Sequence, residues 1–318
     1  MRIVITAVAL CLAAPAVADT VFVSDEVQNV LHVIDGPTGA LRPPMPVGQR
    51  PRGMELSPDR RTLYIAEGNS NRIDAMDLAT RRITRQLNSG TDPERFVVSP
   101  DGKRLYIANE DHSAVTFLDI AGNKAIRDVT VGPQPEGMAV SPDGKLVIAT
   151  SETASTVHFI DAASGKLLDS VLVGSRPRSA IFIKGGRELW VTSEQRGIIS
   201  IFDPATRRIV AKIDLVKLLP SISPVQAVEM RITRDGKRLF VALGRGNHVA
   251  EIDPATRKLV RTWPVGNRNW GIALSPDEKR LYAVAGLSGD MTVIDLAKNA
   301  VLRTVKLGGQ PWGVVAVQ

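Results

Sequence analysis

The chain has 318 residues, of which 44% are apolar, and its 40 basic and 33 acidic residues give a formal charge of +7. This apolar content excludes a disordered chain and is enough for a large buried core. The single cysteine, Cys11, lies in an apolar N-terminal segment. The rest of the chain therefore offers no disulfide, no c-type haem attachment and no thiolate metal site.

The N-terminal segment has the pattern of a secretory signal. Arg2 is followed by an apolar run over residues 3–14 and then by Ala16-Val17-Ala18, the small-residue pattern of a cleavage site. We predict a signal peptide over residues 1–18, a single domain over residues 19–318, and export to the periplasm. The apolar run is shorter than the roughly 20 residues that span a membrane, so no membrane span is expected.

Export also bears on partners. Loss of Arg2 leaves 39 basic residues and lowers the formal charge from +7 to +6. This moderate excess favours an anionic partner or surface without identifying one, and we expect no nucleic acid outside the cytoplasm.

A short signature returns seven times along the chain. Its clearest copy is Gly-Pro-Gln-Pro-Glu-Gly-Met-Ala-Val-Ser-Pro-Asp-Gly at residues 132–144. Aligned on the second Gly of this copy, the repeats fall at Gly53, Arg95, Gly137, Ser179, Glu229, Gly271 and Gly313. The steps are 42 residues, except for one step of 50 between Ser179 and Glu229. A fixed period of this size indicates a repeat architecture.

Each repeat contains four strand patterns. One follows Pro-x-Gly, and the next three are typified by residues 105–109, 114–119 and 125–131, with a Gly-Asn turn at Gly122-Asn123. An apolar residue, usually aromatic, stands thirteen residues before an aspartate in every copy, which predicts a middle hairpin without insertions. These pairs are Phe22 and Asp35, Tyr64 and Asp77, Tyr106 and Asp119, Ile148 and Asp161, Trp190 and Asp203, Phe240 and Asp253, and Tyr282 and Asp295.

Seven four-stranded repeats predict an all-β, seven-bladed β-propeller. The apolar residues 314–317 form an innermost strand, and residues 21–24 begin a repeat that lacks one. We therefore expect the C-terminal strand to pair with the N-terminal strands and close the ring, which removes two exposed sheet edges. A linear β-solenoid fits less well, because its turns are shorter and it needs caps.

The repeats resemble a known family. The segments Leu63-Tyr64-Ile65-Ala66-Glu67 and Leu105-Tyr106-Ile107-Ala108-Asn109, with the Pro-x-Gly and Ser-Pro-Asp-Gly turns, are similar to YVTN-family β-propellers over the whole mature chain. A signal followed by seven such repeats resembles the PQQ-dependent catabolism-associated β-propeller proteins. That resemblance implies an accessory role beside periplasmic quinoprotein dehydrogenases.

The x residues of Pro-x-Gly should point into one mouth of the central channel. They are Arg52, Glu94, Glu136, Arg178, Val228, Trp270 and Trp312, and Arg95, Glu55, Glu229 and Arg231 lie on or beside the same strands. Loops on a rigid ring commonly carry ligand contacts, so we predict a ligand or partner site here. Its predicted members are Arg52, Glu94, Arg95, Glu136, Arg178, Glu229, Arg231, Trp270 and Trp312.

In this predicted site, Arg52 and Arg178 would grip an anionic or carbonyl-bearing molecule, and Trp270 and Trp312 would stack on its flat part. The alternative is a salt-bridged mouth plugged by aromatic side chains.

Other features leave alternatives open. Basic turns on the opposite face could dock an anionic partner or simply be solvated. Carboxylates after the second strands, among them Glu26, Glu67, Glu110, Glu152 and Glu194, lack the spacing of a calcium loop, and the four histidines are scattered, so no metal site is expected. The extra residues around 216–224 could cover the channel mouth, meet a partner, or pack on their own leucines.

Three functions remain. The favoured interpretation is an exported, non-catalytic binding or accessory protein, a monomer without a cofactor. Its partner would be a periplasmic quinoprotein dehydrogenase, another protein or a small anionic ligand. The alternatives are a lactonase-like propeller hydrolase and a pure docking scaffold. An enzyme is less favoured because the sequence has no nucleophile motif, no paired histidines and no convincing metal set.

Overall fold

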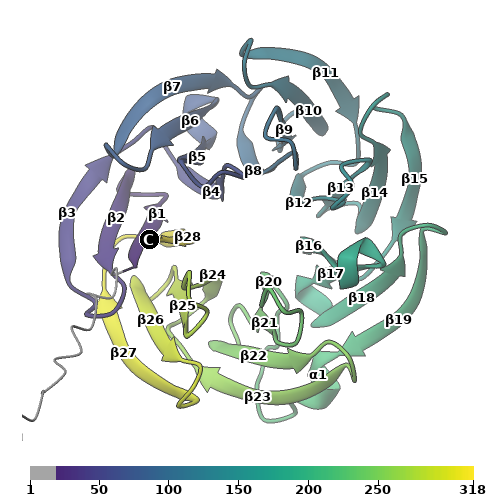
Figure 1. Cartoon of the computed structure of the whole chain (residues 1–318). Coiled ribbons are helices and arrows are strands. Elements are labelled where there is room, and N and C mark those ends of the chain that lie inside the picture. Colours follow the sequence, from purple (N-terminus) through teal and green to yellow (C-terminus); the bar gives the residue numbers. More distant parts are fainter. Residues whose placement is uncertain (1–18) are drawn as a thin grey trace, which may run out of the picture.

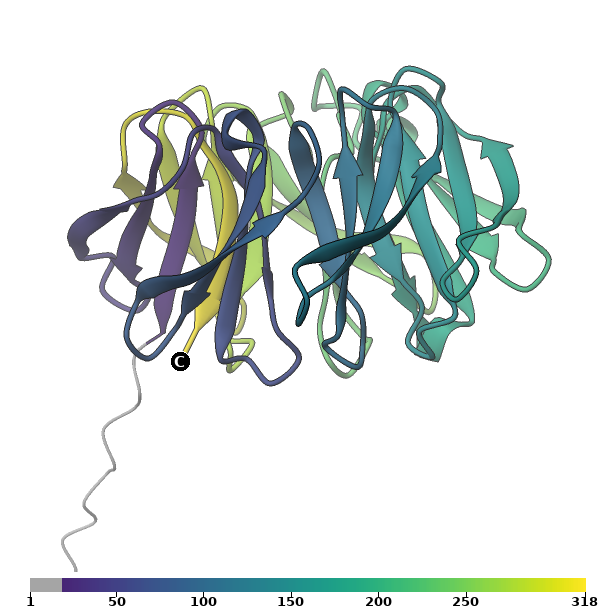
Figure 2. The ribbon, with the colours of Figure 1, turned by 90° about the horizontal axis from the view of Figure 1, so that it is seen from above.

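The computed structural model describes residues 19–318. Seven four-stranded antiparallel sheets stand side by side in a closed ring (Figure 1), so the predicted seven-bladed propeller is confirmed. Seen from the side, the strands of the blades run between two opposite faces of the ring (Figure 2). The predicted signal peptide lies outside the described residues.

The blades are numbered here from the first complete repeat, and their strands are given from the channel outward. Blade 1 holds β4 (Pro51–Leu56), β5 (Thr62–Glu67), β6 (Arg72–Asp77) and β7 (Arg82–Asn88), and blade 2 holds β8 (Pro93–Val98), β9 (Arg104–Asn109), β10 (Ala114–Asp119) and β11 (Lys124–Thr130). Blade 3 holds β12 (Pro135–Val140), β13 (Leu146–Ser151), β14 (Thr156–Asp161) and β15 (Leu167–Leu172), and blade 4 holds β16 (Pro177–Ile183), β17 (Glu188–Ser193), β18 (Ile198–Asp203) and β19 (Arg208–Asp214). Blade 5 holds β20 (Met230–Ile232), β21 (Leu239–Ala242), β22 (His248–Asp253) and β23 (Lys258–Pro264), and blade 6 holds β24 (Asn269–Leu274), β25 (Arg280–Ala285), β26 (Asp290–Asp295) and β27 (Ala300–Lys306). Blade 7 holds β28 (Pro311–Val317), β1 (Thr20–Asp25), β2 (Val30–Asp35) and β3 (Leu41–Pro46).

The apolar core lies between blades. Strand residues alternate across a sheet, so each middle strand presents one set of side chains to each neighbouring blade. In one such layer, Tyr106 and Phe117 of blade 2 meet edge to face with ring centroids 4.7 Å apart, and they share a core with Met138 and Val147 of blade 3. Burying each such side chain contributes roughly 1.5–3 kcal/mol, so neighbouring blades stabilise one another.

The ring is closed by the two ends of the described chain. Strand β1 pairs antiparallel with β28, with Phe22 opposite Val315 and Val21 opposite Ala316, and on its other side it pairs with β2. The predicted closure is confirmed. The pairing covers the edge of β1 that would otherwise be open for another chain to extend.

The extra residues between blades 4 and 5 pack on the core. They begin with the short helix α1 (Leu215–Leu218). Leu215, Leu219 and Val225 are buried in the apolar cluster between these blades. The segment does not line the channel mouth, so of the three alternatives the packed loop is the one the structure contains.

Among residues 19–318, none of the helices combines the length and the apolar character that crossing a bilayer requires. Some lysines of the basic turns lie beside aspartates of their own turns, as Lys145 Nζ does at 3.8 Å from Asp143 Oδ2.

Candidate functional site

The glycine of Pro-x-Gly brings the innermost strands of neighbouring blades close together. A Cβ atom on Gly53 would lie 2.7 Å from the carbonyl oxygen of Glu94, the x residue of the next blade. The same contact would be 2.6 Å for Gly271 and Trp312. Only glycine leaves room for this approach. Because of it, the x side chains of successive blades gather around one mouth of the channel.

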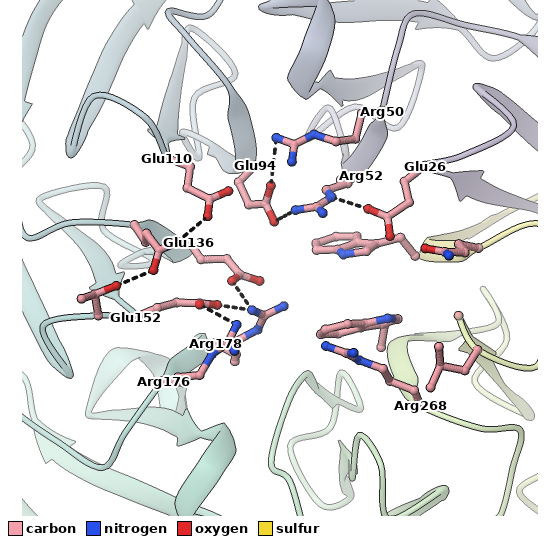
Figure 3. Close-up of a pocket in the computed structure, with 17 residues that line it drawn as sticks. Glu26, Arg50, Arg52, Glu94, Glu110, Glu136, Glu152, Arg176, Arg178 and Arg268 are labelled. Carbon is pink, nitrogen blue, oxygen red and sulfur yellow. Dashed lines mark hydrogen bonds and ion pairs between the residues drawn. The ribbon is translucent and has the colours of Figure 1, made fainter.

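A cavity of about 420 Å³ occupies this mouth (Figure 3). Six of the nine predicted site residues line it: Arg52, Glu94, Glu136, Arg178, Trp270 and Trp312. Further charged residues that line it are Glu26, Arg50, Glu110, Glu152, Arg176 and Arg268. Glu26, Glu110 and Glu152 are among the carboxylates noted in the sequence after the second strands of the repeats. Val228, the remaining x residue, is instead buried in the core between blades 5 and 6.

Sequence reasoning missed the residue two positions before x. At this position Arg50, Asp92, Gln134, Arg176 and Arg268 all have left-handed backbone, with φ between 53° and 61°. Residues other than glycine seldom adopt this conformation, and where it persists it marks positions with a structural or functional demand. Four of the five line the cavity. The signal was the fixed offset from Pro-x-Gly, which recurs with the repeat.

Arg178 is the centre of a cluster on one wall. Its Nη1 lies 2.7 Å from Glu136 Oε2 and also donates a hydrogen bond to Glu152 Oε1. The other oxygen of Glu152 accepts a 2.7 Å hydrogen bond from Arg176 Nη2. Arg178 Nη2 has no hydrogen-bond partner among residues 19–318. The guanidinium of Arg178 thus contacts two carboxyl groups through Nη1, and its Nη2 remains available to donate a hydrogen bond to a ligand.

Glu136 and Glu152 differ in how readily they ionise. Burial raises the pKa of Glu136 well above its ordinary value, against the opposing charge of Arg178. Burial also opposes ionisation of Glu152, but the hydrogen bond from Glu136 and the charges of Arg178 and Arg176 lower its pKa to about 2. The two pKa values are therefore shifted in opposite directions, and Glu152 ionises more readily than Glu136. Two carboxyl groups with separated pKa values are suited to acid and base roles.

The second predicted anion donor, Arg52, is also paired. Its Nε donates a 2.6 Å hydrogen bond to Glu26 Oε2, and its Nη1 donates to Glu94 Oε1. Burial opposes its charge, but Glu94 and Glu26 outweigh burial and raise its pKa. The mouth is thus the salt-bridged arrangement that the sequence left open.

The two indoles differ in access. Trp312 is only 2% exposed, and the guanidiniums of Arg95 and Arg52 lie 4.5 and 5.8 Å from its ring centroid. Trp270 is partly exposed and lies between Arg178 at 4.8 Å and Arg268 at 4.1 Å. Trp270 is therefore the indole that a ligand can reach, whereas Trp312 is a packed part of the wall.

Arg95, Glu229 and Arg231 lie deeper and do not line the mouth cavity. Arg95 Nη2 donates a 2.9 Å hydrogen bond to Glu229 Oε2, and Arg231 Nη1 lies 2.5 Å from Glu229 Oε1. The first of these pairs joins blades 2 and 5 below the mouth, and the second lies within blade 5. Together they form the floor of the mouth.

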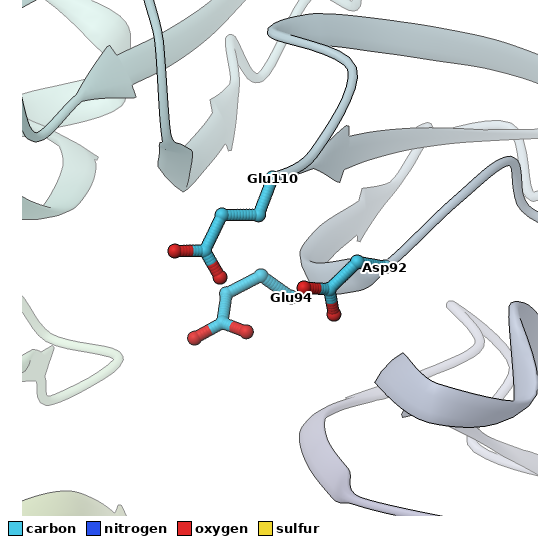
Figure 4. A group of neighbouring side chains, drawn as sticks. All are labelled: Asp92, Glu94 and Glu110. Atoms are coloured by element: carbon cyan, nitrogen blue, oxygen red, sulfur yellow. The ribbon is translucent and has the colours of Figure 1, made fainter.

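Among residues 19–318, Asp92, Glu94 and Glu110 could present three carboxylate oxygens to one cation, since these oxygens lie within 4.8 Å of one another (Figure 4). Arg50, however, forms an ion pair with Asp92 and lies 3.9 Å from Glu94. Arg52 contacts Glu94 as well. In this arrangement guanidinium groups supply the positive charge that balances the cluster.

Comparison with known families gives a match over part of the chain. The model of the family described as Lactonase, 7-bladed beta-propeller matches residues 80–172. No curated protein sequence matches the chain.

Solved structures share the fold across nearly the whole chain. The periplasmic gluconolactonase of Pseudomonas aeruginosa is 22% identical, with a TM-score of 0.77 over 94% of this chain and 99% of that one. A putative 6-phosphogluconolactonase of Bacteroides fragilis is 16% identical, with a TM-score of 0.76 over 96% of this chain and 100% of that one. A functionally unknown protein of Desulfotomaculum acetoxidans is 15% identical, with a TM-score of 0.79 over 94% and 99% of the two chains. At these identities the likeness establishes the fold alone.

Two expectations are corrected by these findings. The favoured interpretation, a non-catalytic accessory protein of PQQ-dependent oxidation, is contradicted by the lactonase family match and by neighbours that carry lactonase names. The expectation that the protein is not an enzyme is contradicted by the same findings. They favour the lactonase-like alternative. Sequence reasoning set it aside for lack of a nucleophile motif, but arginines and carboxylates can serve ester hydrolysis without one.

Proposed function

We propose that this protein hydrolyses a small lactone in the mouth cavity. The observation that carries the proposal is the cluster on its wall, in which Arg178 contacts both Glu136 and Glu152, two carboxyl groups whose pKa values are shifted in opposite directions. The lactonase family match over residues 80–172 supports the same reaction class. Glu136 and Glu152 both fall within the matched segment.

In the proposed reaction, Arg178 Nη2 donates to the lactone carbonyl oxygen and stabilises the negative charge that develops on it. Guanidinium donors fixed in a buried site act strongly on such charge. The ionised Glu152 accepts a proton from the attacking water, and the protonated Glu136 gives its proton to the ring oxygen as the ring C–O bond breaks. One new C–O bond forms and one breaks, and the product is the hydroxy acid.

The cavity suits a single-ring substrate. Its volume of about 420 Å³ lies at the small end of the range for ligand pockets. The partly exposed Trp270, beside Arg178, offers an indole face for the C–H surface of a sugar or aliphatic lactone. The charged remainder of the wall favours a hydroxylated ring over a purely apolar one.

We further propose that the hydrolase acts in the periplasm. The signal pattern over residues 1–18 supports export. A periplasmic gluconolactonase among the structural neighbours is compatible with this location. We further propose that the repeats are of the YVTN type, a resemblance that concerns the propeller fold and not the proposed reaction.

The test is acid release from glucono-1,5-lactone and from aliphatic lactones, measured at constant pH against the spontaneous rate. We expect Glu152→Gln, Glu136→Gln and Arg178→Lys each to lower kcat/KM by roughly 10²- to 10⁴-fold, the range for positioned acid, base and oxyanion groups. Asp169→Asn, at an exposed outer-strand position, is the matched control and should change nothing. Full activity in all three variants, or no acceleration of any lactone, would refute the proposal.

A further inference from the structure

The opposite end of the channel holds a second hollow. Two cavities of about 350 and 400 Å³ lie there, and both are lined by Met54, Glu55, Leu56 and Arg231. Of the x residues of the mouth site, Arg178 also lines the first of these cavities, whereas Arg52, Glu136 and Trp270 line neither. The ion pair between Arg95 and Glu229 lies between the two ends of the channel. The hollow therefore borders the mouth site at Arg178, while the rest of its lining is its own.

The chemistry of this hollow differs from that of the mouth. Two residues after the aligned glycine position, the innermost strands of the seven blades carry Glu55, Val97, Ala139, Ile181, Arg231, Ala273 and Val315. All seven line one or both cavities. Five of these seven are apolar, and the other two are one carboxylate and one guanidinium. Further charged residues that line the cavities are Arg95, Arg178, Arg60, Arg234 and Glu278, of which Arg178 is paired with Glu136 and Glu152 and Arg234 with Glu278.

The guanidiniums near Glu55 are already engaged. Arg231 Nη1 lies 2.5 Å from Glu229 Oε1 and donates a 3.1 Å hydrogen bond to the carbonyl oxygen of Met230. Arg95 donates to both oxygens of Glu229, at 3.3 and 2.9 Å. The charged groups that act on Glu55 are Arg231, Glu229 and Arg95. One shared carboxylate, Glu229, thus neutralises much of the positive charge of both arginines.

Glu55 itself has no hydrogen-bond or ion-pair partner among residues 19–318. Burial raises its pKa, the charges of Arg231 and Arg95 oppose that rise, and the charge of Glu229 adds to it. Its oxygens are open to the hollow, since they are not among the buried polar atoms without partners. An unpartnered carboxylate beside apolar residues such as Val97 and Ile181 is complementary to a donor that carries positive charge.

We propose that this hollow binds a small organic amine, whose ammonium group donates to Glu55 and whose alkyl or aryl body packs against Val97 and Ile181. A neutral alcohol would gain the apolar contact but only a weaker hydrogen bond. A carboxylate of the same length would be repelled by Glu55. The proposal does not depend on lactone hydrolysis at the other mouth.

Isothermal titration calorimetry with hexylamine at pH 8 tests it, since the probe is then an ammonium ion and an alkaline pH favours the ionised form of Glu55 against the rise that burial causes in its pKa. We expect hexylamine to bind at a ratio of one, with hexanol and hexanoate at least tenfold weaker. Glu55→Gln keeps the side-chain shape but removes the charge, and it should weaken the amine by roughly ten- to hundredfold, the range for hydrogen bonds to charged groups. Val97→Phe should also weaken binding, by filling the cavity.

Two controls separate the hollow from the mouth. Glu152→Gln, in the mouth site, should bind hexylamine as the unaltered protein does, and Glu55→Gln should retain lactone hydrolysis. Equal binding of hexylamine and hexanol, equal binding by Glu55→Gln, or loss of binding only in Glu152→Gln would each overturn the proposal. Thermal unfolding of every variant shows that it is folded.

Discussion

Arg95 Nη2 lies 2.9 Å from Glu229 Oε2, although the two residues are 134 positions apart and come from blades 2 and 5. The Glu229 side chain is 3% exposed and the Arg95 side chain 14%. This pair spans the channel below the mouth cavity and carries the guanidinium that lies over Trp312. Its integrity therefore links the packing of opposite blades to the shape of the candidate site.

We expect Glu229→Gln to destabilise the ring, because Arg95 and Arg231 would then lie together without a carboxylate. Breaking one side of a buried pair costs about 3–5 kcal/mol, whereas replacing both sides by apolar residues is often nearly neutral. Chemical denaturation should show that loss for Glu229→Gln and partial recovery in a double variant with Arg95→Met. A Glu229→Gln protein as stable as the original would show that the pair contributes nothing.

The pH dependence of hydrolysis should follow Glu136. The proposed reaction needs a protonated Glu136 and an ionised Glu152. Because burial raises the pKa of Glu136 and the pKa of Glu152 is lowered to about 2, activity should be present between these two values. It should fall as pH rises through the raised pKa of Glu136. Glu136→Gln should remove this alkaline limb along with most of the activity, after correction for spontaneous hydrolysis. An unchanged limb would assign it to another group.

The two indoles should affect different kinetic parameters. Trp270→Ala removes the partly exposed indole, so we expect KM to rise roughly tenfold with a smaller change in kcat. Trp312→Ala opens a cavity beneath Arg52 and Arg95, and should lower the free energy of unfolding by about 3 kcal/mol or more. Steady-state kinetics and denaturation separate the two. Identical behaviour of the variants would contradict the difference in access.

Glu67 should make stability depend on pH. Glu67 is buried and accepts a 2.7 Å hydrogen bond from Gly48 N. Burial raises the pKa of Glu67 to about 8, the Gly48 hydrogen bond opposes this rise, and the neighbouring Asp74 adds to it. Between pH 4.5 and about 8 the folded state keeps a proton on Glu67 that the unfolded state has lost. The free energy of unfolding therefore decreases as the pH rises through this range.

Glu67→Gln keeps a neutral side chain at every pH. The variant should therefore lose less stability than the original protein between pH 5 and 8, by roughly the linkage slope of one proton. Denaturant titrations at both pH values measure this difference. Parallel curves for the two proteins would show that Glu67 does not titrate in this window.

Asp19 should be the N-terminus of the exported protein. It is buried, and its Oδ2 accepts hydrogen bonds from Tyr282 Oη at 3.0 Å and from Arg280 Nη1 at 3.2 Å, both in blade 6. Intact-mass spectrometry of protein recovered from the periplasm should give the mass of residues 19–318. The mass of the full 318-residue chain would contradict cleavage at this bond.

The fold could be predicted from the sequence because every blade repeats the same pattern of strands and turns. The 42-residue period, the Pro-x-Gly approach and the Ser-Pro-Asp-Gly turns occur in copy after copy, so each copy supports the others. Glu94 and Trp270 were placed at the mouth for this reason alone. The period could not show that Arg178 would be engaged by Glu152, because that contact depends on rotamers and on a hairpin of the preceding blade.

The reaction class was harder to predict than the fold. Arginine and glutamate are also the common residues of structural ion pairs, so no local pattern distinguishes a catalytic pair from a salt bridge. Arg268 shows the same limit. Its position at the mouth depends on a left-handed backbone with φ of 61°, and an arginine in the sequence does not predict that conformation.

The closure of the ring gives the candidate site an order of assembly. Glu26 follows β1, Trp312 belongs to β28, and the two strands pair side by side. Residues from the earliest and latest strands thus meet in one cavity wall. A ring with only six blades in place would lack that wall, so it could neither enclose a substrate nor catalyse its hydrolysis. Catalysis should therefore appear in a single step late in refolding, together with the final strand pairing, and its onset would report that the whole ring is shut.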